Sequence, residues 1–194
     1  GRDDNPVVAY FEMGDRSADG VLKIYVCADT TCSSGTERSV NQENSTEFGG
    51  KSSIAIGSNG NPVVSYYDRD NNKLKLYVCG DTSCSNGLDR TLDTNGSPGF
   101  QGLSLVIGND NNPIIAYHKY PTDNPNEELS LYRCGDTTCS SGTASVLYSG
   151  GGRFPSLAIG SENNPMVSYM GGGGRLQLAV CTGAACTGAV AKTL

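Results

Sequence analysis

A short pattern that occurs four times restricts the fold of this chain more than any other feature of its sequence. The pattern is Asn-Pro, two apolar residues, a small residue and Tyr, and it recurs at intervals of 51 to 56 residues. Its copies are Asn5–Tyr10, Asn61–Tyr66, Asn112–Tyr117 and Asn164–Tyr169. Such regular self-similarity is typical of stacked repeats. We therefore treat the 194 residues as a single repeat domain, with repeats 1–48, 49–99, 100–153 and 154–194.

Further motifs flank each copy, and they alternate apolar with small or polar residues as β-strands do. A Ser-initiated motif precedes three copies: Ser53–Gly57, Ser104–Gly108 and Ser156–Gly160. A Leu-initiated motif that ends in Cys follows all four: Leu22–Cys27, Leu74–Cys79, Leu129–Cys134 and Leu176–Cys181. We expect a weaker last strand at Glu37–Val40, Leu88–Leu92, Ala144–Tyr148 and Ala189–Leu194.

Clusters of Gly, Asn, Asp and Ser separate these motifs and indicate turns. Four antiparallel strands in roughly 50 residues is the size of a propeller blade. The sequence therefore predicts an all-β fold, a four-bladed β-propeller-like repeat array of four-stranded antiparallel blades. The first blade lacks its first strand, because no Ser-initiated motif precedes Asn5.

Eight cysteines form four pairs at equivalent repeat positions, each with four residues between its members. The pairs are Cys27 with Cys32, Cys79 with Cys84, Cys134 with Cys139, and Cys181 with Cys186. We expect a disulfide in each pair, because a short hairpin turn satisfies disulfide geometry. Zinc is the alternative, although its four ligands would have to converge from different blades. Disulfides predict an oxidising compartment and hence a secreted, extracellular or cell-surface protein.

These residues resemble a class of secreted microbial repeat proteins with the pattern Ser-x-Ala-Ile-Gly, then Pro-Val-x-Ser-Tyr, then Leu-Lys and two cysteines. The best match is Ser53–Tyr66 followed by Leu74–Cys84, and the resemblance extends over nearly the whole chain. It implies propeller-like extracellular modules with no assigned activity. The fourth repeat departs from the pattern, with Ala179 in place of Tyr and a glycine run at Gly171–Gly174.

Charge and hydropathy argue against several classes of partner. The net charge is −6, with 14 Lys and Arg residues that form no basic cluster, so we expect no nucleic-acid partner and no anionic membrane surface. No apolar stretch approaches the length of a membrane span, which predicts no membrane insertion. Because the chain begins with Gly1 and shows no signal peptide, we expect a processed piece of a longer precursor.

The sequence contains no recognisable enzyme motif, so we expect no catalytic residues and no enzymatic activity. His118, the single histidine, occupies a repeat position filled elsewhere by Phe11, Tyr67 and Met170, which is typical of an ordinary packed side chain. Carboxylates converging from different blades for glycoside cleavage remain an alternative.

Two local patterns suggest ligands or modification. Asp68, Asp70 and Asn72 place oxygen ligands at alternate positions, as in a calcium loop, although a solvated hairpin turn is the simpler interpretation and no other cofactor is expected. Asn44 and Asn95 each begin an N-glycosylation sequon.

The loop between the second and third strands is long in repeats one and three, at Phe11–Val21 and His118–Glu128. Insertions on one face of a repeat array are where binding sites usually lie, although they can also be merely tolerated. We therefore expect a non-catalytic extracellular structural or interaction module with a protein or glycan partner. A lectin-like glycan-binding propeller is the alternative, with the four recurring Tyr residues either stacking sugars or filling the core. Donation of the missing strand by a neighbouring molecule would give a dimer or filament.

Overall fold

The computed structural model describes the chain except residues 2, 14–19, 46–50, 161, 184–185 and 187–188, and it leaves out the side chains of 13 and 41–45. It contains four antiparallel sheets in which consecutive strands are neighbours. Sheet 1 comprises β1 (Val7–Met13), β2 (Gly20–Cys27) and β3 (Gly35–Ser45). Sheet 2 comprises β4 (Ser52–Ile56), β5 (Pro62–Asp68), β6 (Lys73–Cys79) and β7 (Gly87–Asp93).

Sheet 3 comprises β8 (Leu103–Ile107), β9 (Pro113–Lys119), β10 (Glu128–Cys134) and β11 (Gly142–Ser149). Sheet 4 comprises β12 (Arg153–Ile159), β13 (Pro165–Met170), β14 (Leu176–Cys181) and β15 (Ala189–Thr193), with a 3-10 turn, η1 (Gly172–Gly174), between β13 and β14. The predicted all-β repeat array is confirmed, including a first sheet with one strand fewer than the others. β3 is longer than the segment Glu37–Val40 expected for it.

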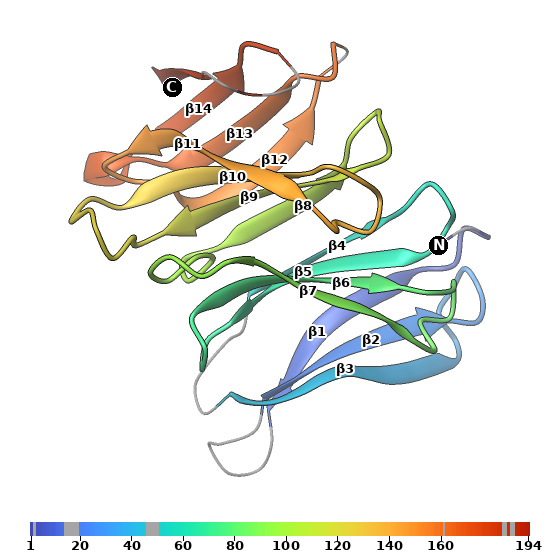
Figure 1. Ribbon diagram of the computed structural model, residues 1–194. Coiled ribbons are helices and arrows are strands. Elements are labelled where there is room, and N and C mark those ends of the chain that lie inside the picture. Colours follow the sequence, from blue (N-terminus) through green and yellow to red (C-terminus); the bar gives the residue numbers. More distant parts are fainter. Residues whose placement is uncertain (2, 14–19, 46–50, 161, 184–185, 187–188) are drawn as a thin grey trace.

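The sheets follow one another from sheet 1 at one end of the molecule to sheet 4 at the other (Figure 1). Within the described residues, no strand of sheet 1 pairs with a strand of sheet 4, so the array does not close into a ring.

Each sheet has a forward face, turned toward the next sheet, and a rear face, turned toward the previous one. Leu22 and Ile24 on the forward face of sheet 1 pack with Val64 and Tyr66 on the rear face of sheet 2. The same positions meet at the two later interfaces. Leu74 and Leu76 pack with Ile115 and Tyr117, and Leu129 and Leu131 pack with Val167 and Tyr169. The apolar core thus consists of three equivalent layers between sheets.

The recurring Tyr residues of sheets 2, 3 and 4 belong to these layers. Tyr66, Tyr117 and Tyr169 are at most 2% exposed, so they fill the core and are not available to stack sugars. Two of their hydroxyl groups bind a carboxylate: Tyr66 donates to Asp89 at 3.0 Å, and Tyr117 donates to Asp93 at 2.7 Å. Burial raises the pKa of Tyr169 to about 12.

The Ser that opens the first-strand motif links sheet 2 to sheet 3 and sheet 3 to sheet 4. The backbone N–H of Leu105 donates to Ser53 Oγ at 3.0 Å, and that of Leu157 donates to Ser104 Oγ at 3.0 Å. Innermost strands of successive sheets do not pair as a continuous ladder, so these side chains satisfy backbone donors that would otherwise be orphaned. The repeat of this Ser is therefore explained by inter-sheet hydrogen bonding.

All four predicted cysteine pairs lie at disulfide distance, one pair in the last turn of each sheet, with Cα atoms 4.8 to 4.9 Å apart. The second cysteine of each pair has a positive φ between 47° and 56°, in the left-handed region, where the chain turns back toward the last strand. Because the pairs belong to four separate turns, they do not gather as a shared zinc site would require. The pairs are Cys27 and Cys32, Cys79 and Cys84, Cys134 and Cys139, and Cys181 and Cys186.

In three of these loops an Asp closes the turn. Asp81 Oδ1, for example, accepts hydrogen bonds from the backbone of Ser83 at 2.9 Å and of Ser85 at 3.1 Å. The Ser85 hydroxyl, the Ser83 hydroxyl and these N–H groups hold the pKa of Asp81 well below its usual range. The turn is thus fixed by hydrogen bonds as well as by its cysteine pair.

One further expectation concerns membranes. Across the described residues, we find no helix with the length and apolar character needed to cross a membrane.

Candidate functional site

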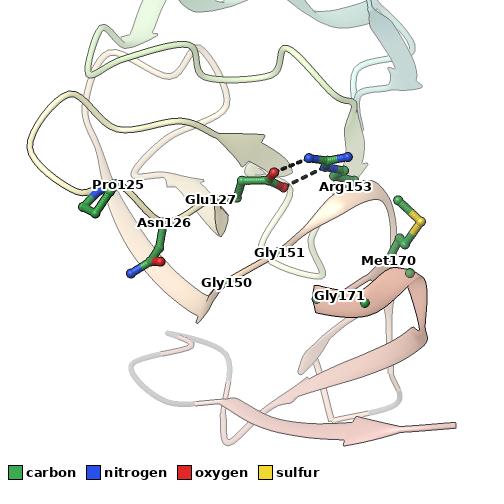
Figure 2. A pocket seen from close by; sticks show the side chains of 11 residues that line it. Pro125, Asn126, Glu127, Gly150, Gly151, Arg153, Met170 and Gly171 are labelled. Carbon is green, nitrogen blue, oxygen red and sulfur yellow. Dashed lines mark hydrogen bonds and ion pairs between the residues drawn. The ribbon is translucent and has the colours of Figure 1, made fainter.

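A cleft of about 430 Å³ lies between sheets 3 and 4, beside the β9–β10 loop (Figure 2). The β9–β10 loop contributes Pro125, Asn126 and Glu127 to its lining. The β11–β12 connection contributes Gly150, Gly151 and Arg153, and the end of sheet 4 contributes Met170 and the glycine run 171–174. The volume is within the range of small-molecule sites. One of the two long loops expected to carry binding residues therefore borders a cleft.

Close approach of two glycine segments shapes one wall of the cleft. A Cβ atom on Gly151 would lie 2.8 Å from the Cα atom of Gly171, and one on Gly172 would lie 2.9 Å from the carbonyl oxygen of Gly150. Both distances are too short for a side chain, so these contacts require glycine. The glycine run includes the turn η1, and its backbone packs against residues 150–151.

Glu127 is the centre of a polar cluster beside the cleft. Arg153 donates from Nε to Glu127 Oε2 at 2.7 Å and from Nη2 to Oε1, the paired arrangement drawn in Figure 2. The Tyr120 hydroxyl donates to Oε1 at 2.8 Å and accepts a hydrogen bond from Arg153 Nη2 at 3.0 Å. Chiefly because of Arg153, and despite partial burial, the pKa of Glu127 falls to about 2. Glu127 is therefore ionised at neutral pH.

The His118 side chain contacts two members of this cluster, Glu127 and Tyr120. Its ring is fully buried, with Nε2 3.2 Å from Glu127 Oε2 and an edge-to-face contact to Tyr120 at 4.7 Å between ring centres. Burial lowers the pKa of His118, although Glu127 opposes the shift. Within the described structure, His118 Nδ1 has no hydrogen-bond partner. The imidazole is thus a neutral, packed side chain that donates from Nε2, in agreement with the expectation of an ordinary side chain at this position.

A row of aromatic rings connects sheet 2 to the cluster. Tyr67 contacts Phe100 at 6.1 Å between ring centres, and Phe100 contacts Tyr120 at 6.4 Å. Arg69 places its guanidinium carbon 5.9 Å from the centre of the Phe100 ring. Phe100 is 36% exposed. An apolar, partly exposed surface therefore adjoins the polar cluster.

The proposed calcium ligands lie in the β5–β6 hairpin of sheet 2. The Asp68 carboxylate is buried and accepts a hydrogen bond from the backbone N–H of Asn71 at 3.0 Å. Asn72 Oδ1 accepts one from the Tyr67 hydroxyl at 2.7 Å, and Asp70 is exposed. These oxygens close the hairpin. Nor does the described part of the chain bring together three His, Cys, Asp or Glu residues suited to a metal ion. A calcium site here remains a prediction from sequence.

The two glycosylation sequons differ in setting. Asn44 lies on β3, but its side chain and Thr46 fall outside the described residues. Asn95 is half-buried, and its Oδ1 accepts hydrogen bonds from the Thr122 hydroxyl at 2.8 Å and the Thr122 N–H at 3.2 Å. The Asn95 sequon therefore packs against the β9–β10 loop, and its modification remains a prediction.

The sequence did not reveal Glu127, Arg153 and Tyr120 as a group. Glu127 and Arg153 belong to the third repeat and to its junction with the fourth, 26 residues apart. The available signal was an acidic residue in a long loop and a basic residue in a connection, both expected at the same end of the strands.

The chain matches no protein family and no curated protein by sequence. Among solved structures it is similar to a protein of unknown function from Dyadobacter fermentans, with a TM-score of 0.68 and 9% identity over 99% of this chain and 66% of that one. It is also similar to a GH43 β-1,3-galactosidase solved with galactodeoxynojirimycin, with a TM-score of 0.54 and 12% identity over 97% of this chain and 72% of that one.

A third similar structure is an α-L-arabinanase from Penicillium chrysogenum complexed with arabinobiose, with a TM-score of 0.47 and 12% identity over 69% of this chain and 46% of the enzyme. The chain spans 66% of the length of the Dyadobacter protein. At these identities the likenesses concern the fold alone. By its fold, this chain is an open, β-propeller-like array of four repeated sheets.

Proposed function

We propose that this protein is a non-catalytic extracellular binding module that holds a neutral saccharide in the cleft between sheets 3 and 4. The observation that carries the proposal is the composition of the cleft. Its described lining contains one acidic and one basic side chain, Glu127 and Arg153, and these two neutralise each other. A ligand with many hydroxyl groups and no net charge suits such a surface.

The glycine walls favour the same class of ligand. Cβ atoms built on Gly173 and Gly174 would meet no other described atom within 4 Å, so their backbone faces open space. Exposed peptide groups supply donors and acceptors that match sugar hydroxyls, and the side chain of Met170 adds an apolar contact. Asn126, which is exposed, adds an amide with both donor and acceptor capacity.

The state of Glu127 supports binding over hydrolysis. Cleavage of a glycosidic bond by the usual route needs two carboxyl groups flanking the bond, one of them protonated. Among the described residues that line the cleft, Glu127 is the one carboxylate, and its lowered pKa leaves it ionised at neutral pH, with no proton to donate to a leaving group. A single ionised carboxylate held by Arg153 suits a scaffold that orients a ligand.

Four disulfide-bonded turns support the extracellular setting. Such bonds persist in oxidising compartments, whereas cytosolic thiols are kept reduced. We propose that the protein is secreted or displayed at the cell surface, where free and polymeric glycans are available as ligands.

A glycan array followed by titration calorimetry tests the function. We expect neutral oligosaccharides to bind, and Asn126→Ala to weaken the best ligand about 5- to 10-fold, the loss of about one hydrogen bond. Asn109→Ala is the matched control, because Asn109 is also exposed and lies outside the cleft lining. Equal loss in both variants, an absence of glycan binding, or release of new reducing ends from the ligand would each contradict the proposal.

A further inference from the structure

We propose that copies of this chain associate head to tail, with the forward face of sheet 4 docking on the rear face of sheet 1 in a second copy. These two end faces carry the same repeat positions that form the three sheet–sheet interfaces inside the chain. Among the described strands, none covers either face in the open array. The inference does not depend on the cleft or on any saccharide.

The forward face of sheet 4 is exposed where its equivalents are buried. Leu22, Leu74 and Leu129 begin the third-strand motif in repeats one to three, and they are 2%, 0% and 0% exposed. Leu176 occupies the same position in the fourth repeat and is 54% exposed. Leu178 is half-buried, whereas its equivalents Ile24, Leu76 and Leu131 are at most 2% exposed. The residue type is apolar at Leu176 although no described part of this chain buries it.

The rear face of sheet 1 shows the complementary pattern. Val64, Ile115 and Val167 occupy one position on the rear faces of sheets 2, 3 and 4, and each is fully buried. Val8 is their equivalent in sheet 1 and is 47% exposed. An apolar β-branched side chain at this position is what a preceding forward face packs against at all three internal interfaces.

The charged groups on the rear face of sheet 1 do not prevent docking. Lys23 forms ion pairs with Glu37 at 2.6 Å and with Glu12 at 2.5 Å, and the Tyr10 hydroxyl donates to the Glu37 carboxylate. Sheet 2 has the same trio at the same positions, because Lys75 pairs with Asp89 at 2.6 Å and Tyr66 donates to Asp89.

In sheet 2 this trio borders the interface with sheet 1, where Tyr66 is 2% exposed and packs with Leu22 and Ile24. A rear face with this neutralised trio is therefore already covered by a forward face once within the chain, and sheet 1 offers a second copy of that surface. Because the two docking faces are different, the contact is heterologous. It produces a ring if the rotation closes and a filament otherwise.

Sedimentation velocity and light scattering of the 194-residue chain over a range of concentrations test the proposal. We expect masses that are multiples of the 20.2 kDa monomer and that rise with concentration. Val8→Glu places a charge on the rear face of sheet 1, and Leu176→Glu places one on the forward face of sheet 4. Each variant should be a monomer. Both residues are about half exposed, so the fold should tolerate the substitutions. Val146→Glu is the control, because Val146 is 54% exposed and lies in sheet 3, away from both end faces.

Mixing the two variants gives the sharpest result. The Val8→Glu chain retains an intact sheet 4, and the Leu176→Glu chain retains an intact sheet 1, so an equimolar mixture should form a one-to-one dimer and nothing larger. Circular dichroism and the thermal midpoint of each variant report whether it has folded. If one of them does not fold, the smaller polar substitution at the same position, Val8→Ser or Leu176→Ser, replaces it.

Several outcomes would overturn the proposal. A wild-type chain that stays monomeric would leave the two faces to a different partner or to further repeats. Association that survives both variants would indicate strand addition at the edge of β1 instead. Association lost in only one variant would indicate like-with-like packing of the face that this variant alters, and association lost in both but not restored by mixing would rule out the head-to-tail contact. Saccharide binding can succeed or fail independently of each result.

Discussion

Glu127→Gln is expected to destabilise the protein at neutral pH and to have almost no effect in strong acid. Glutamine keeps the shape of the side chain but removes the charge that opposes Arg153. The pKa of Glu127 falls from an ordinary 4.5 to about 2 in the folded protein. At about 1.4 kcal/mol for each pKa unit, complete transfer of this shift into stability would give about 3 kcal/mol.

Solvent reduces that figure, because the Arg153 side chain is 38% exposed and water screens its charge. We therefore expect about 1–2 kcal/mol at about pH 7. A carboxyl group whose pKa is lowered by folding stabilises the protein above its unfolded pKa, and this contribution disappears as the pH falls through the folded value. The window for Glu127 thus runs from about 4.5 down to about 2.

Urea unfolding of wild type and Glu127→Gln at a series of pH values measures the effect. The free energies of unfolding should differ at neutral pH and converge near the lower end of the window. Glu162→Gln, at an exposed carboxylate of sheet 4, is the control and should match wild type throughout. A difference that stays constant across the whole pH range would refute the reasoning, because it would arise from packing and not from charge.

Other parts of the structure give shorter predictions. Ser104→Ala removes the acceptor for the Leu157 N–H and should cost about 1–3 kcal/mol in urea unfolding, whereas Ser156→Ala, at the equivalent exposed position of sheet 4, should cost little. Leu131→Ala empties part of the layer between sheets 3 and 4 and should cost about 2–5 kcal/mol by the same measurement. Replacing both cysteines of one bridge by Ser should cost about 2 kcal/mol, and alkylation of the native protein without reductant should modify no thiol. Asp81→Asn should leave the protein less sensitive to acid, since the lowered pKa of Asp81 stabilises the fold above its unfolded value and that stabilisation is lost as the pH falls.

Much of the fold could be predicted from the sequence, because each sheet repeats one set of local signals. The Asn-Pro pattern marks the start of β5, β9 and β13, where a missing N–H does least harm to the ladder. The cysteine spacing identified the bridged turns, although the left-handed backbone of Cys32, Cys84, Cys139 and Cys186 carries no sequence signal. Closure could not be predicted, because alternation within a strand says which residues face a neighbouring sheet and nothing about the angle between sheets.

The candidate site was harder to predict from the sequence, because its residues come from different repeats. Glu127 and Arg153 meet only when sheets 3 and 4 stack, and no motif connects a loop in one repeat to a connection at the next. The glycine run 171–174 was visible in the sequence, but its close contact with Gly151 is a tertiary feature. His118 was predicted correctly as a packed side chain because its repeat position showed which residues substitute for it.

The serial order of the four sheets has a consequence for how the molecule opens. Every extensive contact between sheets in the described part of the chain joins consecutive ones, so stability is the sum of the sheets and three junctions. Sheets 2 and 3 have two junctions each, whereas sheets 1 and 4 have one. In the monomer, amide protons should therefore exchange fastest at the two ends and slowest in β5, β6, β9 and β10, and the protein should unfold by losing end sheets before its middle.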